Sequence, residues 1–234
     1  DLSLAGWFDR EATEVDLTGY HLSTDRMGLL SAALPAGSLV PARGWISFTD
    51  VKVPVANRIG EEGEGFKITM AGFDHGRYTV ASGATGIIRA CLDASVSYAK
   101  TRKTFGKPIA EHQLIQEKIA KMSQDYEIAH LLYLQAGWLK NLGKRCTREI
   151  SYAKKFATEA SFSAATEAIQ IHGAYGFSDE YDVERYLRNS KGAVIYEGSS
   201  EVQTLIQAGY ALGLREDKPL RCEPPAYDEK EWQS

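Results

Sequence analysis

The chain has 234 residues, of which 44% are hydrophobic and 25% charged, the composition of a globular protein. Its net charge of −4 offers no basic surface for sequence-independent binding to nucleic acid or anionic lipid. No segment approaches the roughly 20 apolar residues that a membrane-spanning helix needs. Three widely spaced cysteines, Cys91, Cys146 and Cys222, fit neither a disulfide framework nor a CxxC metal site. Nucleic-acid-binding, membrane-spanning and CxxC-type metal proteins are therefore disfavoured.

The first part of the chain has the pattern of β structure. Turn-forming glycines and prolines recur between short runs that are rich in β-branched and aromatic residues, and residues 45–53 form the clearest strand. Pro54 is expected to end its ladder because proline has no N–H to donate. A glycine- and acid-rich hinge follows at residues 58–65. We therefore predict a β domain over residues 1–63, a helical domain over 64–214 and an extended tail over 215–234.

Two long helices are predicted after the hinge. The first runs from Phe66 to about Lys100, although four glycines, Gly72, Gly76, Gly83 and Gly86, each cost about 1 kcal/mol relative to alanine. Close packing of another backbone or of a ligand would explain them. The second carries one apolar stripe with alternating spacings of four and three, and Gly143 is its expected stop. The stripe consists of Ile115, Ile119, Met122, Tyr126, Ala129, Tyr133 and Ala136.

Three further helices follow in the sequence. One extends from about Thr147 to Ile171 and is broken by Gly173 and Gly176; its alanine face permits close helix approach. That face consists of Ala153, Ala157, Ala160, Ala164 and Ala168. A short helix covers residues 183–188, and a last one residues 198–212. The four principal helices predict a mainly α fold, an antiparallel four-helix bundle preceded by part of a β-barrel-like domain.

Three segments at helix ends contain residues that a bundle does not need: residues 102–108, 170–176 and 195–201. Helix N-termini there present backbone N–H groups that favour phosphate, and Arg102 and Thr104 add hydrogen-bond donors. Each segment alone also has a purely structural explanation, as a helix stop, a solvated charge or a helix-terminal acid. Glu197 differs because apolar residues precede it and Gly198 removes bulk after it. A partly dehydrated carboxylate of this kind is a stronger base towards a carbon acid.

Together, these segments resemble the acyl-CoA dehydrogenase family over nearly the whole chain. The resemblance rests on residues 48–54 and 60–66, on Arg102 to Gly106, on Gln170 to Gly176 and on Tyr196-Glu197-Gly198, which occur in the family's order and at its separations. It implies that Glu197 removes the α-proton of an acyl-CoA thioester while the β-hydride passes to N5 of FAD, which gives a trans-2-enoyl-CoA. The backbone N–H of Glu197 would then donate to the thioester carbonyl.

The resemblance also assigns binding residues. It places Asp74, Arg77, Tyr196 and Gly198 at the substrate and makes the other matched residues contacts of the FAD cofactor. Those FAD contacts are Arg102, Thr104, Gln113, Gln170, Ile171, His172, Gly173, Ala174, Ser199 and Glu201. His172 is expected to pack or to donate a hydrogen bond there rather than to take part in catalysis, and no metal is expected. Some subfamilies carry the base on the long helix, beside the position of Arg77; here that neighbour is Gly76.

Several features of the resemblance leave its interpretation open. Ala174 replaces the family's more common glycine, and Ser199 its more common threonine. The amino-terminal helical domain and the first half of the β domain are absent, so we expect a cleaved piece or a missing partner segment. An acyl-CoA oxidase or an enoyl-CoA reductase would share these residues. A non-catalytic helical-bundle subunit is the other alternative, and the presence of Glu197, Arg102 and Gln170 together argues against it. The C-terminus, which ends in Gln233-Ser234, is not a peroxisomal address and argues modestly against the oxidase.

The family further implies partners and a compartment. A homo-oligomer, expected to be a homotetramer, would receive the acyl-CoA substrate in fatty acid metabolism, and an electron-transferring flavoprotein would accept the electrons. No nucleic-acid or membrane partner is expected. The start at Asp1 carries no targeting pattern, so the bacterial cytoplasm is preferred over the mitochondrial matrix. Acyl-chain length and branching cannot be predicted from these residues.

Overall fold

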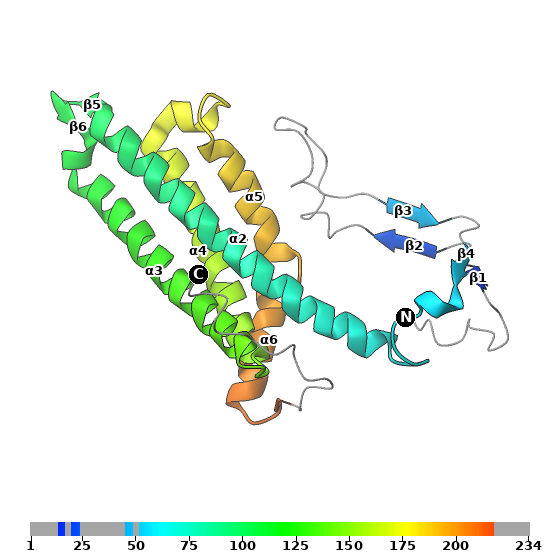
Figure 1. Ribbon diagram of the computed structural model, residues 1–234. Helices are drawn as coiled ribbons and strands as arrows, with labels where there is room; N and C mark the ends of the chain where they lie inside the picture. The colour runs from blue at the N-terminus through cyan, green and yellow to red at the C-terminus, as the bar shows by residue number, and fades with distance from the viewer. Residues whose placement is uncertain (1–13, 17–19, 24–44, 49–51, 218–234) are drawn as a thin grey trace, which may run out of the picture. The chain divides into compact units, whose positions relative to one another are not determined.

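The computed structural model describes residues 14–16, 20–23, 45–48 and 52–217, with side chains from residue 52 onwards (Figure 1). It divides into two compact units, residues 1–73 and 74–234. Most of the predicted β domain, Cys222 and most of the predicted tail lie outside the described residues. The predicted domain boundary between residues 63 and 64 stays a prediction.

The first unit contains two short antiparallel strand pairs. Strand β1 (Glu14–Asp16) pairs with β4 (Lys52–Pro54), and β2 (Tyr20–Ser23) pairs with β3 (Trp45–Phe48). The single strand predicted over residues 45–53 is therefore wrong: its two ends belong to different sheets. Pro54 is the last paired residue, opposite Glu14, as its missing N–H predicts. A 3₁₀ turn, η2 (Val55–Asn57), follows.

The second unit is a helical bundle in which the three longest helices alternate in direction (Figure 1). Helix α2 (Gly65–Thr101) enters it from the first unit and is followed by α3 (Gln113–Asn141) and α4 (Thr147–His172). A small hairpin of β5 (Lys103–Thr104) and β6 (Lys107–Pro108), with the turn η3 (Ile109–Glu111), connects α2 to α3. The mainly α bundle predicted from the sequence is confirmed.

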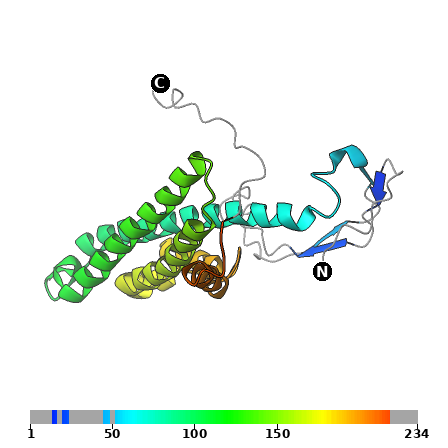
Figure 2. The same cartoon turned by 90° about the horizontal axis from the view of Figure 1, so that it is seen from below.

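Helix α4 is the central element of the bundle because α3, α5 and α6 all pack on it. After η4 (Gly173–Phe177) come α5 (Val183–Ile195) and α6 (Ser200–Ala211). Figure 2, which views the molecule from below, shows α6 beside α4. The predicted alanine face of α4 is buried throughout, and so are Met122, Ala129 and Ala136 of the predicted stripe on α3. Most of these side chains meet Ala84, Ile88 and Cys91 of α2 in one core, whereas Ala136 packs in a second cluster with Cys146 and Ile150.

The helix ends follow local chemistry in most places. Gly143 has a φ of 66° and closes α3 with a Schellman motif, in which its own N–H reaches the carbonyl of Lys140 and the N–H of Lys144 reaches that of Leu139. Helix α4 ends at His172, one residue beyond the predicted end near Ile171. Helix α5 continues to Ile195, well beyond the predicted end at residue 188. Ser190 and Ala193 are buried in this extension, so packing carries the helix through Gly192, a residue of low helix propensity.

The glycines of α2 do not share one explanation. A β-carbon at Gly76 would meet the carboxylate of Glu197. At Gly72, Gly83 and Gly86 it would meet no atom of the described residues within 4 Å. The expected close packing is therefore present at Gly76 and absent at the other three positions within the described chain.

Candidate active site and cofactor cavity

Glu197 lies in the short connection between α5 and α6, where the backbone is left-handed. Its φ is 55° and that of Gly198 is 85°. A residue with a β-carbon in this region carries a conformational cost of about 1–3 kcal/mol, which surrounding contacts must offset. Gly198 also lacks room for a side chain, since a β-carbon there would lie 2.7 Å from Nε2 of Gln203. The final helix therefore begins at Ser200 rather than at residue 198.

Three side chains from three helices bind the carbonyl groups of this turn. Nε of Arg77 in α2 donates to the carbonyl of Glu197 at 3.3 Å. Nζ of Lys154 in α4 donates to the carbonyl of Gly198 at 2.8 Å. Nε2 of Gln203 in α6 reaches both carbonyls, at 3.4 Å and 3.1 Å respectively. These contacts from separate elements fix the position of the turn.

The carboxylate of Glu197 points to α2, where Gly76 leaves room for it. A β-carbon at residue 76 would lie 2.6 Å from Oε2 and 3.1 Å from Oε1 of Glu197. Oε2 is buried and has no hydrogen-bond partner among the described residues. Buried carboxylate oxygens are normally satisfied, so an unsatisfied one marks a position where a ligand group can bind. The arrangement suits a base that receives a proton from a bound substrate.

Asp74 and Arg77, the predicted substrate contacts on α2, both connect to this turn. Asp74 accepts from Nη1 of Arg77 at 3.0 Å and from the hydroxyl of Thr147 at 2.8 Å. Both side chains are largely buried. The pair thus links α2 to the Glu197 turn through Arg77 and to the start of α4 through Asp74.

Tyr196 lies immediately before the base and is partly buried. Burial raises the pKa of its phenol, and the charge of Glu197 raises it further. Its ring lies close to Gly192, where a β-carbon would meet Cε1 at 3.3 Å. The neutral ring forms part of the apolar approach to Glu197 that the sequence predicts.

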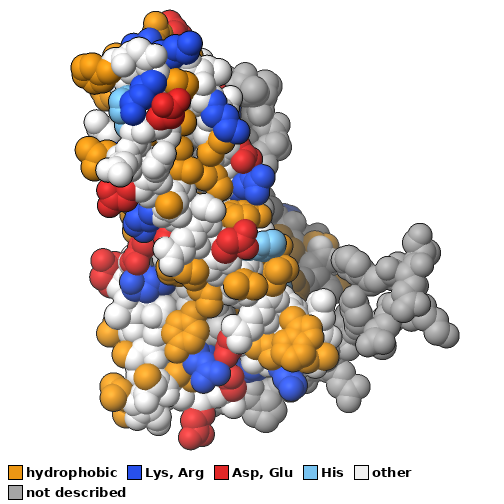
Figure 3. Space-filling model, turned by 90° about the vertical axis from the view of Figure 1, so that its left-hand side faces the viewer, with side chains coloured by type: hydrophobic (Ala, Val, Ile, Leu, Met, Phe, Trp, Pro, Cys, Tyr) orange, Lys and Arg blue, Asp and Glu red, His pale blue; other side chains and the backbone are white. Residues whose placement is uncertain are grey.

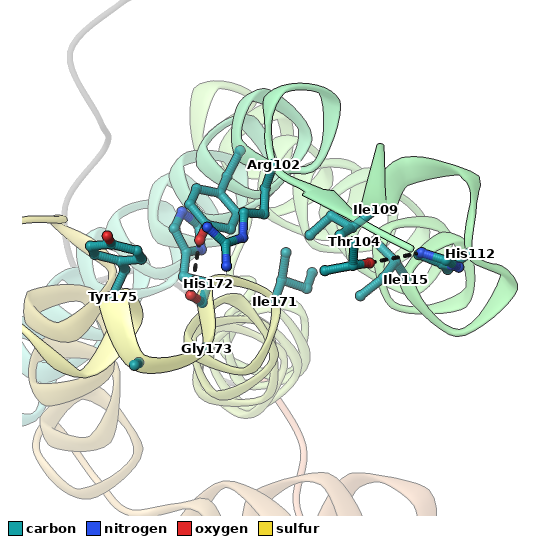
Figure 4. Close-up of a pocket in the computed structure, with 11 residues that line it drawn as sticks. Arg102, Thr104, Ile109, His112, Ile115, Ile171, His172, Gly173 and Tyr175 are labelled. Carbon is teal, nitrogen blue, oxygen red and sulfur yellow. Dashed lines mark hydrogen bonds between the residues drawn. The ribbon is translucent and has the colours of Figure 1, made fainter. Parts of the chain in front are cut away.

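A cavity of about 450 Å³ lies where the β5–β6 hairpin meets the end of α4 (Figure 4). The Arg102 side chain reaches from the end of α2 towards the Ile171–Gly173 segment. Thr104 Oγ1 and His112 Nε2 are 3.0 Å apart on the opposite side. The cavity is lined by Tyr98, Arg102, Thr104, Ile109, His112, Ile115, Ile171, His172, Gly173, Ala174 and Tyr175.

His172 forms the aromatic part of this cavity. Its ring stacks on Tyr98 with centroids 4.2 Å apart, and Nδ1 donates to the carbonyl of Ala168 at 2.8 Å. Burial lowers the pKa of His172, partly offset by that carbonyl. The neutral imidazole therefore packs on Tyr98 and donates a hydrogen bond within α4. Packing and hydrogen bonding are the roles that the sequence predicts for His172. Gly173 beside it has φ 62° and ψ −135°, a conformation that residues with a β-carbon rarely adopt.

The structure brings most of the predicted cofactor residues together and leaves others apart. Arg102, Thr104 and the residues from Ile171 to Ala174 line the cavity. Gln113 and Gln170 are not among the lining residues. Ser199, the N-cap of α6, and Glu201 lie beside Glu197 instead. A hydrogen bond from Ser199 lowers the pKa of Glu201.

Sequence reasoning missed several lining residues, among them Tyr98 and His112. Tyr98 precedes Arg102 by one helical turn, which is a signal that could have been used. His112 enters through the β5–β6 hairpin, which returns the chain towards Thr104. It also missed Lys154 and Gln203, whose polar side chains are fully buried beside the base. The available signal for Lys154 was its position between Ala153 and Ala157, where a charged residue interrupts a predicted apolar face.

The cavity fits one end of a dinucleotide cofactor. Its size falls in the range of small-molecule sites. Arg102 provides charge for a phosphate, and Gly173 lets a ligand approach the backbone, since a β-carbon there would meet no described atom within 4 Å. The Tyr98–His172 stack offers a flat apolar wall. These residues suit a pyrophosphate and an attached aromatic ring.

Residues 63–211 match the family pattern of the acyl-CoA dehydrogenase C-terminal domain. The chain belongs to the acyl-CoA dehydrogenase family, which confirms the resemblance seen in the sequence.

Similar proteins agree with this assignment. A probable acyl-CoA dehydrogenase, YngJ of Bacillus subtilis, is 47% identical over 167 residues, covering 71% of this chain and 44% of that protein. Subunit CarC of the caffeyl-CoA reductase-Etf complex of Acetobacterium woodii is 44% identical, with coverage of 71% and 44%. Butyryl-CoA dehydrogenase from Megasphaera elsdenii superimposes with a TM-score of 0.71 at 44% identity, covering 73% of this chain and 44% of that structure. The chain thus spans less than half the length of these relatives.

None of the helices in the described part of the chain is both long and apolar enough to cross a bilayer.

Proposed function

We propose that the chain acts in flavin-dependent α,β-dehydrogenation of an acyl-CoA thioester to trans-2-enoyl-CoA, with Glu197 as the base. The observation that carries this proposal is the carboxylate of Glu197, whose buried Oε2 has no partner among the described residues and lies against Gly76. An α-proton delivered to this oxygen would find an acceptor that is already oriented and partly shielded from water.

The turn that holds Glu197 supplies a second contribution to the proposed reaction, a backbone hydrogen-bond donor. The backbone N–H of Glu197 is proposed to donate to the thioester carbonyl as negative charge develops there. The carbonyls of Glu197 and Gly198, in the two peptides that follow this N–H, accept hydrogen bonds from Arg77, Lys154 and Gln203, which restrains the turn that carries it. Tyr196 is proposed as a wall of the substrate site, Gly198 as a close backbone contact, and Asp74 and Arg77 as contacts towards the CoA portion.

FAD is the proposed cofactor, and when bound it would supply the acceptor of the β-hydride at N5. Arg102 and Thr104 would bind its phosphate and hydroxyl groups, and His172, Gly173, Ala174 and Ile171 would line its nucleotide end. Gln113, Gln170, Ser199 and Glu201 stay proposed contacts to the remainder of the cofactor.

Partners are proposed from the relatives and from the surface. The name of CarC includes an Etf complex, which supports an electron-transferring flavoprotein as acceptor. A homo-oligomer is supported by Leu131, Leu134 and Trp138 on α3, which are 65%, 46% and 61% exposed. A homotetramer is the proposed state. Figure 3 shows apolar side chains spread among charged ones on one face of the molecule. The bacterial cytoplasm stays the proposed compartment, with the mitochondrial matrix as the second choice.

The reverse reaction is the second candidate, because CarC is named as part of a reductase. An enoyl-CoA reductase would use the same Glu197 as an acid, since a group that accepts a proton in one direction returns it in the other. An acyl-CoA oxidase would use Glu197 as the same base but would let oxygen reoxidise the flavin. A non-catalytic subunit would keep the bundle without the chemistry.

Replacement of Glu197 tests the proposed base. Flavin-loaded full-length protein carrying Glu197→Gln should lose about 10³-fold or more of its flavin bleaching rate with acyl-CoA, because no carboxylate remains to take the proton. The matched control is Glu184→Gln, an acid paired with Arg188 on α5. Wild-type bleaching in Glu197→Gln would exclude Glu197 as the base, and protein without bound FAD would favour the non-catalytic subunit.

A further inference from the structure

Lys154 is a charged residue in an unexpected place. It lies in the first half of α4, on the buried face that also carries the alanines, and its exposed fraction is 0%. Lysine is almost never fully buried unless its ammonium has a specific partner. Within the described chain, its Nζ donates a 2.8 Å hydrogen bond to the carbonyl of Gly198. The buried amine thus serves the turn that follows Glu197.

Gln203 approaches the same turn from α6 and is also fully buried. Its Nε2 donates to the carbonyls of both Glu197 and Gly198, while its Oε1 is buried with no partner among the described residues. Ser151 of α4 donates to the backbone carbonyl of Gln203 at 3.1 Å and so fixes this residue against α4. Both helices therefore place a buried donor on the carbonyls of the left-handed turn.

We propose that Lys154 and Gln203 are positioning residues, which hold the two carbonyls of the left-handed turn and thereby direct the carboxylate of Glu197. This inference rests on the proposed role of Glu197 as the base. The turn needs such support because Glu197 adopts a φ of 55°, which a residue with a β-carbon leaves readily when nothing opposes it. Neither positioning residue needs to touch the substrate.

The charge state of Lys154 gives the proposed positioning a pH dependence that can be measured. Burial, and next the charge of Arg77, lower the pKa of Lys154 to about 8, while Glu197, Glu159 and Glu201 oppose this shift. These are the charged groups that act on it from α2, from its own helix and from the turn and α6. The ammonium donates a stronger hydrogen bond to the carbonyl than the neutral amine does. The turn should therefore be held less firmly above about pH 8.

Burial of Lys154 also determines how this residue affects folding stability. A lysine pKa lowered from 10.5 in the unfolded chain means that the unfolded state binds the proton more tightly. The ammonium therefore lowers folding stability at all pH values below about 8, and this penalty disappears as the pH rises to 10.5. Removal of a residue that only supported the fold would instead lower stability at neutral pH.

The test is Lys154→Met in flavin-loaded full-length protein, with Lys155→Met as the matched control. Lys155 is the next residue on α4 and pairs with Glu159 near the surface. We expect kcat to fall about 10- to 100-fold in Lys154→Met with KM changed less than about twofold, because a misdirected base loses rate rather than binding. The melting temperature at pH 7 should be equal to or above that of the wild type. The wild-type decrease in kcat centred near pH 8 should be absent.

A second variant covers failure of the first to fold. Gln203→Met removes the other donor without touching Lys154, and it should lower kcat in a similar range while it keeps the decrease near pH 8. Wild-type kcat and an unchanged pH profile in Lys154→Met, or a lowered melting temperature with kcat intact, would overturn the proposal. Glu197→Gln is measured alongside: if it stays active, the base assignment fails, whereas an inactive Glu197→Gln with fully active Lys154→Met refutes only the positioning role.

Discussion

Gly76 and the carboxylate of Glu197 occupy complementary space. A β-carbon at residue 76 would lie 2.6 Å from Oε2 of Glu197 and 2.9 Å from its Cδ. Any side chain at position 76 would therefore displace the carboxylate or be displaced by it. The long helix α2 accepts a glycine at this point, and the carboxylate of Glu197 occupies the resulting space.

Gly76→Ala should separate activity from stability. Alanine raises helix propensity by about 1 kcal/mol, but its methyl group would push Glu197 away, so we expect kcat to fall about 10- to 100-fold. Gly83→Ala on the same helix is the control, because its methyl group meets no described atom. It should raise stability by up to about 1 kcal/mol and leave kcat intact. Steady-state kinetics and thermal melting measure both, and full activity of Gly76→Ala would contradict the prediction.

Gly198→Ala should destabilise the protein more than Gly213→Ala. Both glycines have positive φ, 85° and 69°, so alanine is strained at either site. Only at Gly198 does the new methyl group also meet a buried side chain, Nε2 of Gln203 at 2.7 Å. We expect a loss of about 1 kcal/mol for Gly213→Ala and about 2–3 kcal/mol for Gly198→Ala. Urea denaturation of the two variants provides the comparison; equal losses would mean that Gln203 yields without cost.

His172 should make folding stability sensitive to acid. Its folded pKa lies below the unfolded value of 6.5 because of burial, so the unfolded chain binds the proton more readily. Stability therefore declines as the pH falls through 6.5 towards the folded pKa, and His172→Gln should flatten this part of the curve. His75→Gln, at an exposed position on α2, is the control. Urea midpoints between about pH 5 and 8 test this; an unchanged slope in His172→Gln would disprove it.

Arg102→Ala should weaken binding of the proposed cofactor in a salt-dependent manner. Its guanidinium reaches into the cavity, where it would pair with phosphate, and such charge-assisted bonds contribute about 1.5–3 kcal/mol. We expect a roughly 10- to 100-fold increase in the FAD dissociation constant, measured by fluorescence titration of apoprotein. Arg185→Ala is the control because this arginine pairs with Asp182 at the surface. Equal affinity of both variants would remove Arg102 from the cofactor site.

Much of the helical unit was predictable because its signals are local. The stripe of α3 and the alanine face of α4 are repeated apolar spacings; the alanine face is buried throughout, and the stripe is buried at Met122, Ala129 and Ala136. Gly143 and Gly173 end their helices through backbone conformations that glycine favours. The extension of α5 to Ile195 was not predicted, since it depends on the burial of Ser190 and Ala193 in the folded bundle. The strand over residues 45–53 failed because strand pairing is decided by distant partners.

The sequence by itself determined the family and Glu197 as the candidate base, because the three segments keep the family's order and separations along the chain. Only the tertiary structure decided which residues surround that base. Gly76, Lys154 and Gln203 lie far apart in the sequence and meet at the Glu197 turn because α2, α4 and α6 pack around it. No periodicity encodes such a meeting, since it depends on the angles and register with which helices pack. The space for the carboxylate and the donors that fix its turn are therefore properties of the fold.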